Sequence, residues 1–208
     1  YINKRRGAEG MTYLRPLYTS EDAEKATEHF VEQPYDKWFD VLEGVQALYT
    51  DAGHIIGSAA VSLKIKENGK EKRITFSGDL GRYRDVILKS PENFPQADVI
   101  IMESTYGNSL HDNNMTTPEM VLRWIEKACL QKKGKLIMPA FSVGRTQELL
   151  YALNQLELEN RLPDLDYYVD SPLSVEATEV VKNHPEYFNK RIQQVMKSDN
   201  VPEVLAVM

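Results

Sequence analysis

Three polar residues of types that bind metal ions stand where apolar, strand-like runs of the sequence end. His54 lies between two glycines in TDAGHIIGSAAV, Asp79 lies in FSGDLG, and Glu103 closes the run ADVIIME. An imidazole nitrogen and a carboxylate oxygen are common ligands of zinc, and glycines allow the backbone to approach a site closely. Taken singly, the residues have ordinary interpretations: a turn histidine, a turn-forming aspartate and a surface acid. Their repeated position at strand ends favours one shared site.

The chemistry of such a site would be hydrolysis assisted by metal ions. Two zinc ions can activate a water molecule and stabilise a phosphate oxygen. Asp79 could bridge the two ions, and Glu103 could orient a histidine or transfer a proton. A catalytic zinc ion needs about three protein ligands. His54 and Asp79 supply two, and the sequence has no HxH, HxxxH or HxxEH pair, so these residues alone leave the site incomplete.

The first half of the chain is predicted to place these residues by means of β-strands. Residues 19–30 read as a short helix, and apolar alternation predicts a strand over 45–51. The runs AAVSLKIK and RITFSGD flank Asn68 and Gly69, which predicts a β-hairpin. A further buried strand is predicted over 97–103. Val61, Leu63 and Ile65 would share one face of their strand, and Ile74 and Phe76 would line one face of the partner strand.

In the second half of the chain, predicted helices alternate with predicted strands. It predicts a helix from Pro118, a buried strand over 135–141, a helix from Arg145, a strand over 166–170 and a helix from Ser174. This alternation is typical of a parallel α/β sheet. The change from consecutive strands to alternating helices and strands predicts a domain boundary between residues 108 and 117. This boundary divides the chain into 1–112 and 113–208.

Composition narrows the class of protein. The 208 residues suffice for one large or two small domains, and the net charge of −6 argues against a general nucleic-acid coat without excluding a nuclease. The single cysteine, Cys129, excludes an internal disulfide and a cysteine-rich zinc site. No apolar run is long enough to span a bilayer. We therefore expect a cytoplasmic protein with no membrane partner.

Four motifs carry a family resemblance. TDAGHIIGSA, FSGDLG, MESTYGN and PAFSVGRTQELLYAL, in this order and spacing, resemble the β-CASP branch of the metallo-β-lactamase superfamily. That branch includes ribonuclease J, the nuclease subunit of the cleavage and polyadenylation factor, and bacterial and archaeal RNA-processing exonucleases. The resemblance runs through nearly the whole chain. It implies an α/β fold, with part of an αββα sandwich in 1–112 and part of a β-CASP parallel α/β domain in 113–208.

The resemblance also implies roles for individual residues in a zinc-dependent ribonuclease with two metal ions. His54 matches a metal ligand, Asp79 matches the aspartate that bridges both metals, and Glu103 matches the acid that partners a later catalytic histidine. His111 stands where many relatives have a histidine, whereas His184 matches no ligand. The family's HxHxDH motif and its two late histidine motifs are absent. We expect this chain to be a piece of a longer protein that alone binds zinc poorly and is inactive.

A loop at residues 141–146 could bind RNA. Backbone N–H groups at the predicted helix start, with Arg145 beside them, suit a phosphate, and Ser142 and Ser171 occupy similar strand-to-helix positions. For Ser142, Thr146 and Ser171, helix capping explains the sequence equally well. No Walker GxxxxGK[ST] motif supports an NTPase.

Two other functions stay open at this stage. The intact protein could be a DNA nuclease or another hydrolase of the metallo-β-lactamase fold, although the second half of the chain disfavours the small-molecule hydrolases. It could instead be a non-catalytic subunit of an RNA-processing complex, although the presence of His54, Asp79 and Glu103 disfavours that interpretation. A homodimer is possible for the intact protein.

Overall fold

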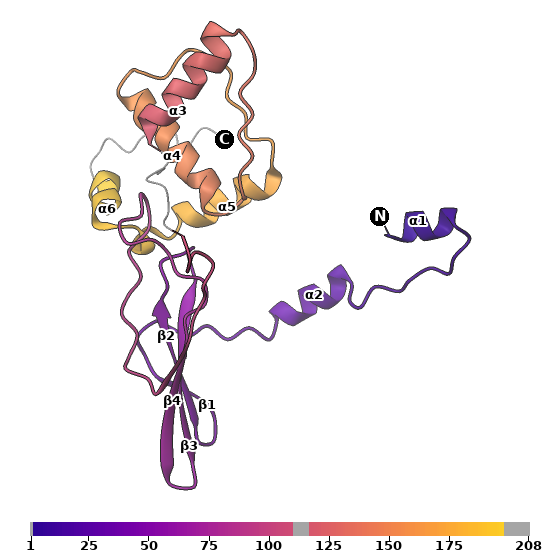
Figure 1. Ribbon diagram of the computed structural model, residues 1–208, viewed down its shortest axis with the longest axis vertical. Helices are drawn as coiled ribbons and strands as arrows, with labels where there is room; N and C mark the ends of the chain where they lie inside the picture. The colour runs from indigo at the N-terminus through magenta and orange to yellow at the C-terminus, as the bar shows by residue number, and fades with distance from the viewer. Residues whose placement is uncertain (1, 110–116, 198–208) are drawn as a thin grey trace. The chain divides into compact units, whose positions relative to one another are not determined.

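The computed structural model describes residues 2–109 and 117–197 (Figure 1). His111 and the predicted boundary between 108 and 117 fall largely outside these ranges, so both stay predictions. The chain separates into two units, Tyr1–Pro34 and Tyr35–Met208. Within the described ranges, no helix has the length and apolar character required to cross a membrane.

The first unit contains two short helices, α1 (Ile2–Ala8) and α2 (Ser20–Thr27). Thr19 caps α2 through a capping box with Asp22. The Thr19 hydroxyl accepts the Asp22 N–H at 3.3 Å, and the Asp22 carboxylate accepts the Thr19 N–H at 2.8 Å. The helix predicted over 19–30 is therefore confirmed in its start. All of its residues are exposed.

The second unit begins with a five-stranded sheet in chain order: β1 (Phe39–Leu42), β2 (Val45–Asp51), β3 (Ala59–Glu67), β4 (Lys70–Phe76) and β5 (Val99–Ile101). The first four strands pair antiparallel, and β5 is parallel to β4. Asn68 and Gly69 join β3 to β4 with φ of 51° and 73°, as a tight hairpin turn requires. The pairs Val61 with Phe76 and Leu63 with Ile74 confirm that the apolar hairpin residues share one face.

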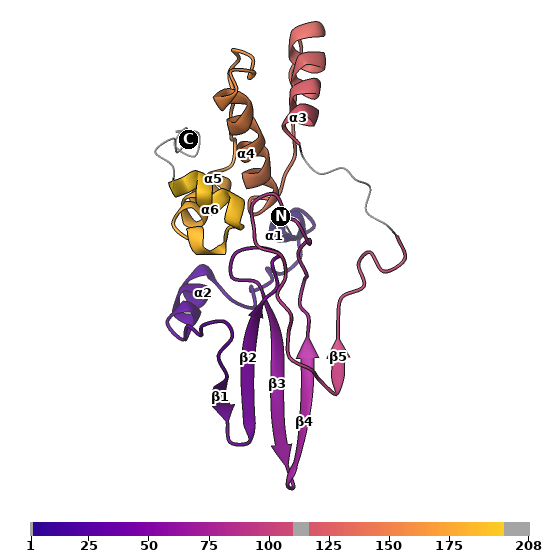
Figure 2. The same ribbon diagram turned by 90° about the vertical axis from the view of Figure 1, so that its left-hand side faces the viewer.

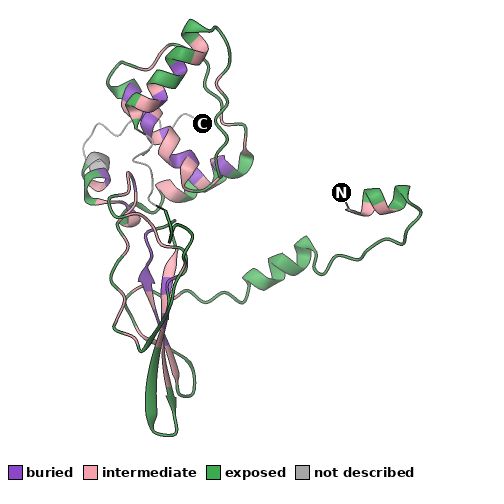
Figure 3. Cartoon of the chain, in the orientation of Figure 1, coloured by how far each residue is buried: buried purple, intermediate pink, exposed green. Residues whose placement is uncertain are grey.

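Burial in the sheet is greatest toward the end at which β2 and β4 finish (Figure 3). At that end, buried residues lie on the face of the sheet opposite to the one that carries Val61 and Phe76. They are Leu48, Thr50, Ala60, Ser62 and Thr75. The hydroxyls of Ser62 and Thr75 lie 2.9 Å apart and hydrogen-bond each other, which satisfies two buried polar groups. The core of the sheet therefore supports the end from which the candidate site residues extend.

Helices form the second half of the described chain. They are α3 (Pro118–Ile125), which continues into a π-helical stretch at Glu126–Gln131, then α4 (Arg145–Leu158), α5 (Pro172–Lys182), a 3₁₀ turn at Pro185–Tyr187, and α6 (Lys190–Lys197). Val121 and Ile125 of α3 pack with Ala152 of α4 in one buried cluster. The helices predicted from Pro118, Arg145 and Ser174 are confirmed, and with the sheet they confirm the α/β class.

Three strand predictions need correction. Residues 135–141 and 166–170 form no strand, and Ile137, Phe141 and Tyr168 are 83%, 87% and 84% exposed. Leu136 instead packs against the cluster of α3 and α4. A strand requires a hydrogen-bonded neighbour, and neither segment pairs with another one in the described ranges. The strand over 99–101 does form, but its residues are exposed because β5 is an edge of the sheet.

Candidate active site

The strand directions bring the three candidate residues to one edge of the sheet. Because β2 and β4 are both antiparallel to β3, and β5 is parallel to β4, these three strands run the same way (Figure 2). His54 follows β2, Asp79 follows β4 and Glu103 follows β5. Side chains that leave parallel strands at their carboxyl ends share one rim. The topology therefore brings the segments of three residues that are far apart in sequence to one edge of the sheet.

Hydrogen bonds fix the backbone around His54. The Asp51 carboxylate accepts the Gly53 N–H at 2.8 Å, and Gly53 has a φ of 61°. On the other side, the Ser58 hydroxyl accepts the N–H groups of His54 and Ile55 at 3.1 and 3.2 Å. The His54 side chain itself is exposed. The sequence thus forms a rigid turn that presents an accessible imidazole.

A close backbone contact joins the Asp79 turn to the His54 turn. The Gly81 N–H donates to the Ala52 carbonyl at 2.8 Å. A Cβ atom at position 81 would lie 1.7 Å from the Gly53 carbonyl oxygen and 2.7 Å from the His54 nitrogen. Only glycine fits such an approach. The last glycine of FSGDLG is therefore required for packing, and it holds the segment of exposed Asp79 against that of His54.

Glu103 is hydrogen-bonded to the segment that carries Asp79. Its carboxylate accepts the Leu80 N–H at 2.8 Å, and its own N–H donates to the Ser77 hydroxyl at 3.1 Å. The Leu80 hydrogen bond, hydrogen bonds to Thr105 and a smaller attraction from His54 lower the pKa of Glu103. Glu103 is thus an ionised acceptor at neutral pH, attached to the turn that carries Asp79.

The start of α4 also reaches this rim. A Cβ at Gly144 would be 3.9 Å from the Ile55 side chain, so the loop before α4 lies against the His54 turn. The buried Gln147 side chain organises this loop. It accepts the Gly144 N–H at 2.7 Å, and it donates to the Ser142 carbonyl at 3.0 Å and to the Thr178 hydroxyl at 2.9 Å. Sequence reasoning missed Gln147, whose only signal was its place three residues after Gly144.

Comparisons with known proteins find relatives of this chain. The Beta-Casp domain family matches residues 146–207. Ribonuclease TTHA0252 of Thermus thermophilus is 33% identical over 86% of this chain and 39% of its own length. An RNase J-like protein of Methanocaldococcus jannaschii is 28% identical over 89% of this chain and 43% of its own length. Residues 146–207 thus match the Beta-Casp domain family, and the chain as a whole is similar to proteins named as ribonucleases.

Other relatives of this chain have a different name. Transcription termination factor FttA of Pyrococcus abyssi is 33% identical over 90% of the chain and 29% of its own length. The chain thus spans less than half the length of each of these curated relatives.

His54 and Asp79 match only part of the donor set that a zinc site requires. An imidazole and a carboxylate are donors that zinc accepts, so His54 and Asp79 fit the ion in kind. They do not fit it in number, because the described residues contain no group of three or more His, Cys, Asp or Glu side chains that could hold a metal ion. Ligation by His54 and Asp79 therefore stays a prediction, and we derive no reaction step through the ion.

The residues predicted to bind RNA have structural partners. Arg145 forms an ion pair with Glu148, whose pKa is raised by burial and lowered less strongly by Arg145. Ser171 caps α5 by accepting the Ser174 N–H at 3.2 Å, and the Thr146 hydroxyl donates to the Phe141 carbonyl at 2.7 Å. Ser171 is thus a helix cap, and Thr146 ties the start of α4 to the preceding loop. RNA contact by Arg145, Ser142 and Ser171 stays a prediction.

The remaining histidine in this part of the chain lies on the surface. His184 is exposed and pairs with Glu186 at 3.1 Å. This placement fits a residue that matched no ligand of the family.

Proposed function

We propose that these residues serve in a metal-dependent hydrolase that cleaves phosphodiester bonds of RNA. The observation that carries the proposal is the convergence of the segments of His54, Asp79 and Glu103 on one rim of the sheet. The names of two relatives, a ribonuclease and an RNase J-like protein, support RNA as the substrate.

Each residue has a distinct role in this proposal. His54 and Asp79 would contribute an imidazole and a carboxylate donor to zinc, together with further ligands from the rest of the natural protein. Bound zinc would supply a water molecule acidic enough to lose a proton near neutral pH. Glu103, held ionised by the Leu80 N–H, orients a histidine or accepts a proton at its free oxygen. Location in the cytoplasm and a homodimer stay predictions.

A role in ending transcription is the second candidate function. It is favoured by relatives named transcription termination factors, which match this chain as well as the named ribonuclease does. Release of transcripts from stalled elongation complexes, measured with the Asp79→Asn variant, separates the two candidates. Release that survives the substitution favours a termination role independent of hydrolysis.

The test is degradation of single-stranded RNA by the natural full-length protein that contains these residues. We expect cleavage that a chelator abolishes and that Asp79→Asn reduces at least a hundredfold, because one carboxylate donor is lost. Glu67→Gln is the matched control, since Glu67 is an exposed carboxylate at the end of β3. Cleavage that is unaffected by both the chelator and Asp79→Asn would refute the proposal.

A further inference from the structure

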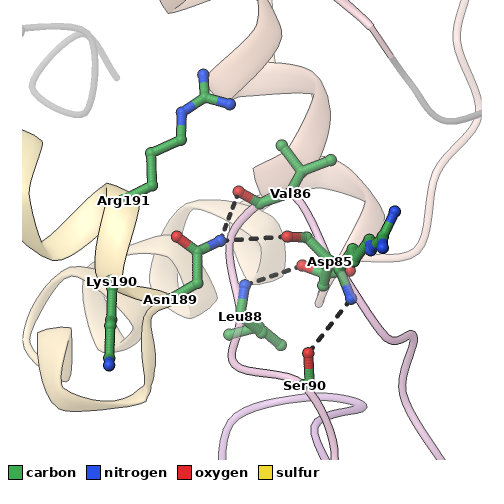
Figure 4. A pocket seen from close by; sticks show the side chains of 8 residues that line it. Asp85, Val86, Leu88, Ser90, Asn189, Lys190 and Arg191 are labelled. Carbon is green, nitrogen blue, oxygen red and sulfur yellow. Dashed lines mark hydrogen bonds between the residues drawn. The ribbon is translucent and has the colours of Figure 1, made fainter.

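A pocket of about 420 Å³ lies between the loop after the Asp79 turn and the start of α6. We call it the Arg84 pocket. Its lining includes Arg84, Asp85, Leu88, Asn189, Lys190 and Arg191 (Figure 4). Three of these side chains are cationic, on a chain whose net charge is −6. The pocket is therefore a local concentration of positive charge.

Hydrogen bonds between distant segments build the floor of the pocket. The Asn189 side chain donates to the Asp85 and Val86 carbonyls at 3.2 and 3.0 Å and accepts the Ile192 N–H at 3.0 Å. The Asn189 backbone N–H donates to the Ile87 carbonyl at 2.8 Å. Because these bonds hold both sides of the pocket, a ligand would meet a preformed site and little ordering cost.

The cations of the pocket are available to an anion. In the described part of the chain, no acidic side chain forms an ion pair with Arg84, Lys190 or Arg191; Arg191 contacts only the neutral groups of Tyr151 and Gln155. Asp85 is the single acidic residue in the lining of the pocket. Its carboxylate accepts hydrogen bonds from the backbone N–H groups of Ile87 and Leu88, at 2.9 and 2.8 Å.

The backbone at Arg84 is strained. Arg84 is exposed and has a φ of 78°, a conformation unusual for a residue with a side chain. Backbone strain of this kind is common at functional sites. The Arg84 N–H donates to the Ser90 hydroxyl at 3.3 Å, which helps to hold the conformation. The loop thus holds Arg84 in a defined backbone conformation at the pocket.

The arrangement of the cations favours a chain of anions over one small anion. Lys190 and Arg191 extend in opposite directions from the start of α6 (Figure 4), so one compact anion could not contact both closely. A nucleic-acid strand carries one charge per nucleotide and can meet each cation with a different phosphate. Arginine suits this role because its guanidinium matches the geometry of a phosphate.

The position of the pocket connects it to the candidate active site. Arg84 follows Asp79 by five residues, so their Cα atoms are at most about 18 Å apart. Because a single strand carries a phosphate at every nucleotide, a few consecutive nucleotides cover this distance. Leu88, in the pocket lining, also packs in the same apolar cluster as Ile56 of the His54 turn. One strand can therefore contact both places.

We propose that the Arg84 pocket binds consecutive backbone phosphates of the RNA, a few nucleotides from the bond cleaved at the Asp79 rim. This inference rests on the proposed function for the identity of the polyanion. It assigns Arg84 and Lys190 to substrate binding.

The test is the affinity of the natural full-length protein for a fluorescently labelled single-stranded RNA, measured by anisotropy with chelator present to prevent cleavage. Arg84→Gln combined with Lys190→Gln is expected to weaken binding roughly tenfold. The slope of log affinity against log salt should fall by about 1.4, since each lost phosphate contact removes about 0.7 on a single strand. Thermal unfolding checks that the variant folds.

The matched control is Lys70→Gln combined with Lys72→Gln, which removes two positive charges from the exposed β4 hairpin strand. It should change affinity less than twofold and leave the slope unchanged. Equal effects of the two double variants, or none from the pocket variant, would overturn the inference while leaving the proposed function intact. Displacement of the RNA by low concentrations of inorganic phosphate would also overturn it. Failure of the unaltered protein to bind RNA would refute the proposed function itself.

Discussion

Gly81→Ala is the substitution that most directly tests how the candidate site is held together. The added Cβ would lie 1.7 Å from the oxygen and 2.2 Å from the carbon of the Gly53 carbonyl. Both are backbone atoms and cannot rotate away, so the two turns must separate. The Gly81 hydrogen bond to the Ala52 carbonyl would then be lost, and the Leu80 hydrogen bond to Glu103 would be lost or weakened.

The magnitude follows from these losses. Two hydrogen bonds contribute about 1 kcal/mol each, and forcing apart a packed contact costs a further 1–3 kcal/mol. We expect the free energy of unfolding of the second unit to fall by about 3–5 kcal/mol. At a urea dependence near 2–3 kcal/mol/M, the midpoint should move down by roughly 1–2.5 M.

The assay is urea unfolding followed by circular dichroism, with Gly134→Ala as the control. A Cβ at Gly134 would meet only the Ala128 carbonyl, at an ordinary 3.4 Å, and Gly134 has no positive φ. Amide hydrogen exchange should also show faster exchange at Leu80 and Gly81 in the Gly81→Ala protein. If the two alanine variants unfold at the same urea concentration, the close approach of the turns is not a stabilising contact and the reasoning is wrong.

Three further predictions concern single residues. Gln147→Met should lower the free energy of unfolding by about 2–4 kcal/mol, because it removes three hydrogen bonds of a buried side chain; a thermal midpoint equal to that of the unaltered protein would contradict this. Glu103 has a lowered pKa, so its contribution to stability should be complete above about pH 4.5 and should be lost as the pH falls through the folded-state value. Glu103→Gln should abolish this part of the acid dependence, measured as unfolding midpoints between pH 3 and 6, roughly the carboxylate titration range. Gly69→Ala should cost only about 1 kcal/mol, from its φ of 73°, since no atom lies within 4 Å of the new Cβ; a loss as large as that from Gly81→Ala would contradict the distinction between strain and collision.

Local signals in the sequence determined much of the architecture. The start of α2 follows from the capping pair of Thr19 and Asp22, and the β3–β4 turn follows from Asn68 and Gly69. The period-2 pattern of the hairpin also fixed which side chains share a face. These features depend on neighbours within a few residues, so the sequence contains all the information needed to predict them.

The tertiary structure alone decided how the site is assembled. The sequence placed His54, Asp79 and Glu103 at strand ends, but only the shared direction of β2, β4 and β5 brings those ends together. The collision that makes glycine necessary at position 81 involves a carbonyl 28 residues away in the chain, and no local pattern encodes it. The segments 135–141 and 166–170 were predicted to be strands and are not, which again shows the dependence on tertiary structure. Their apolar and aromatic residues express a preference for burial and extension, whereas a strand exists only where another segment supplies hydrogen-bond partners.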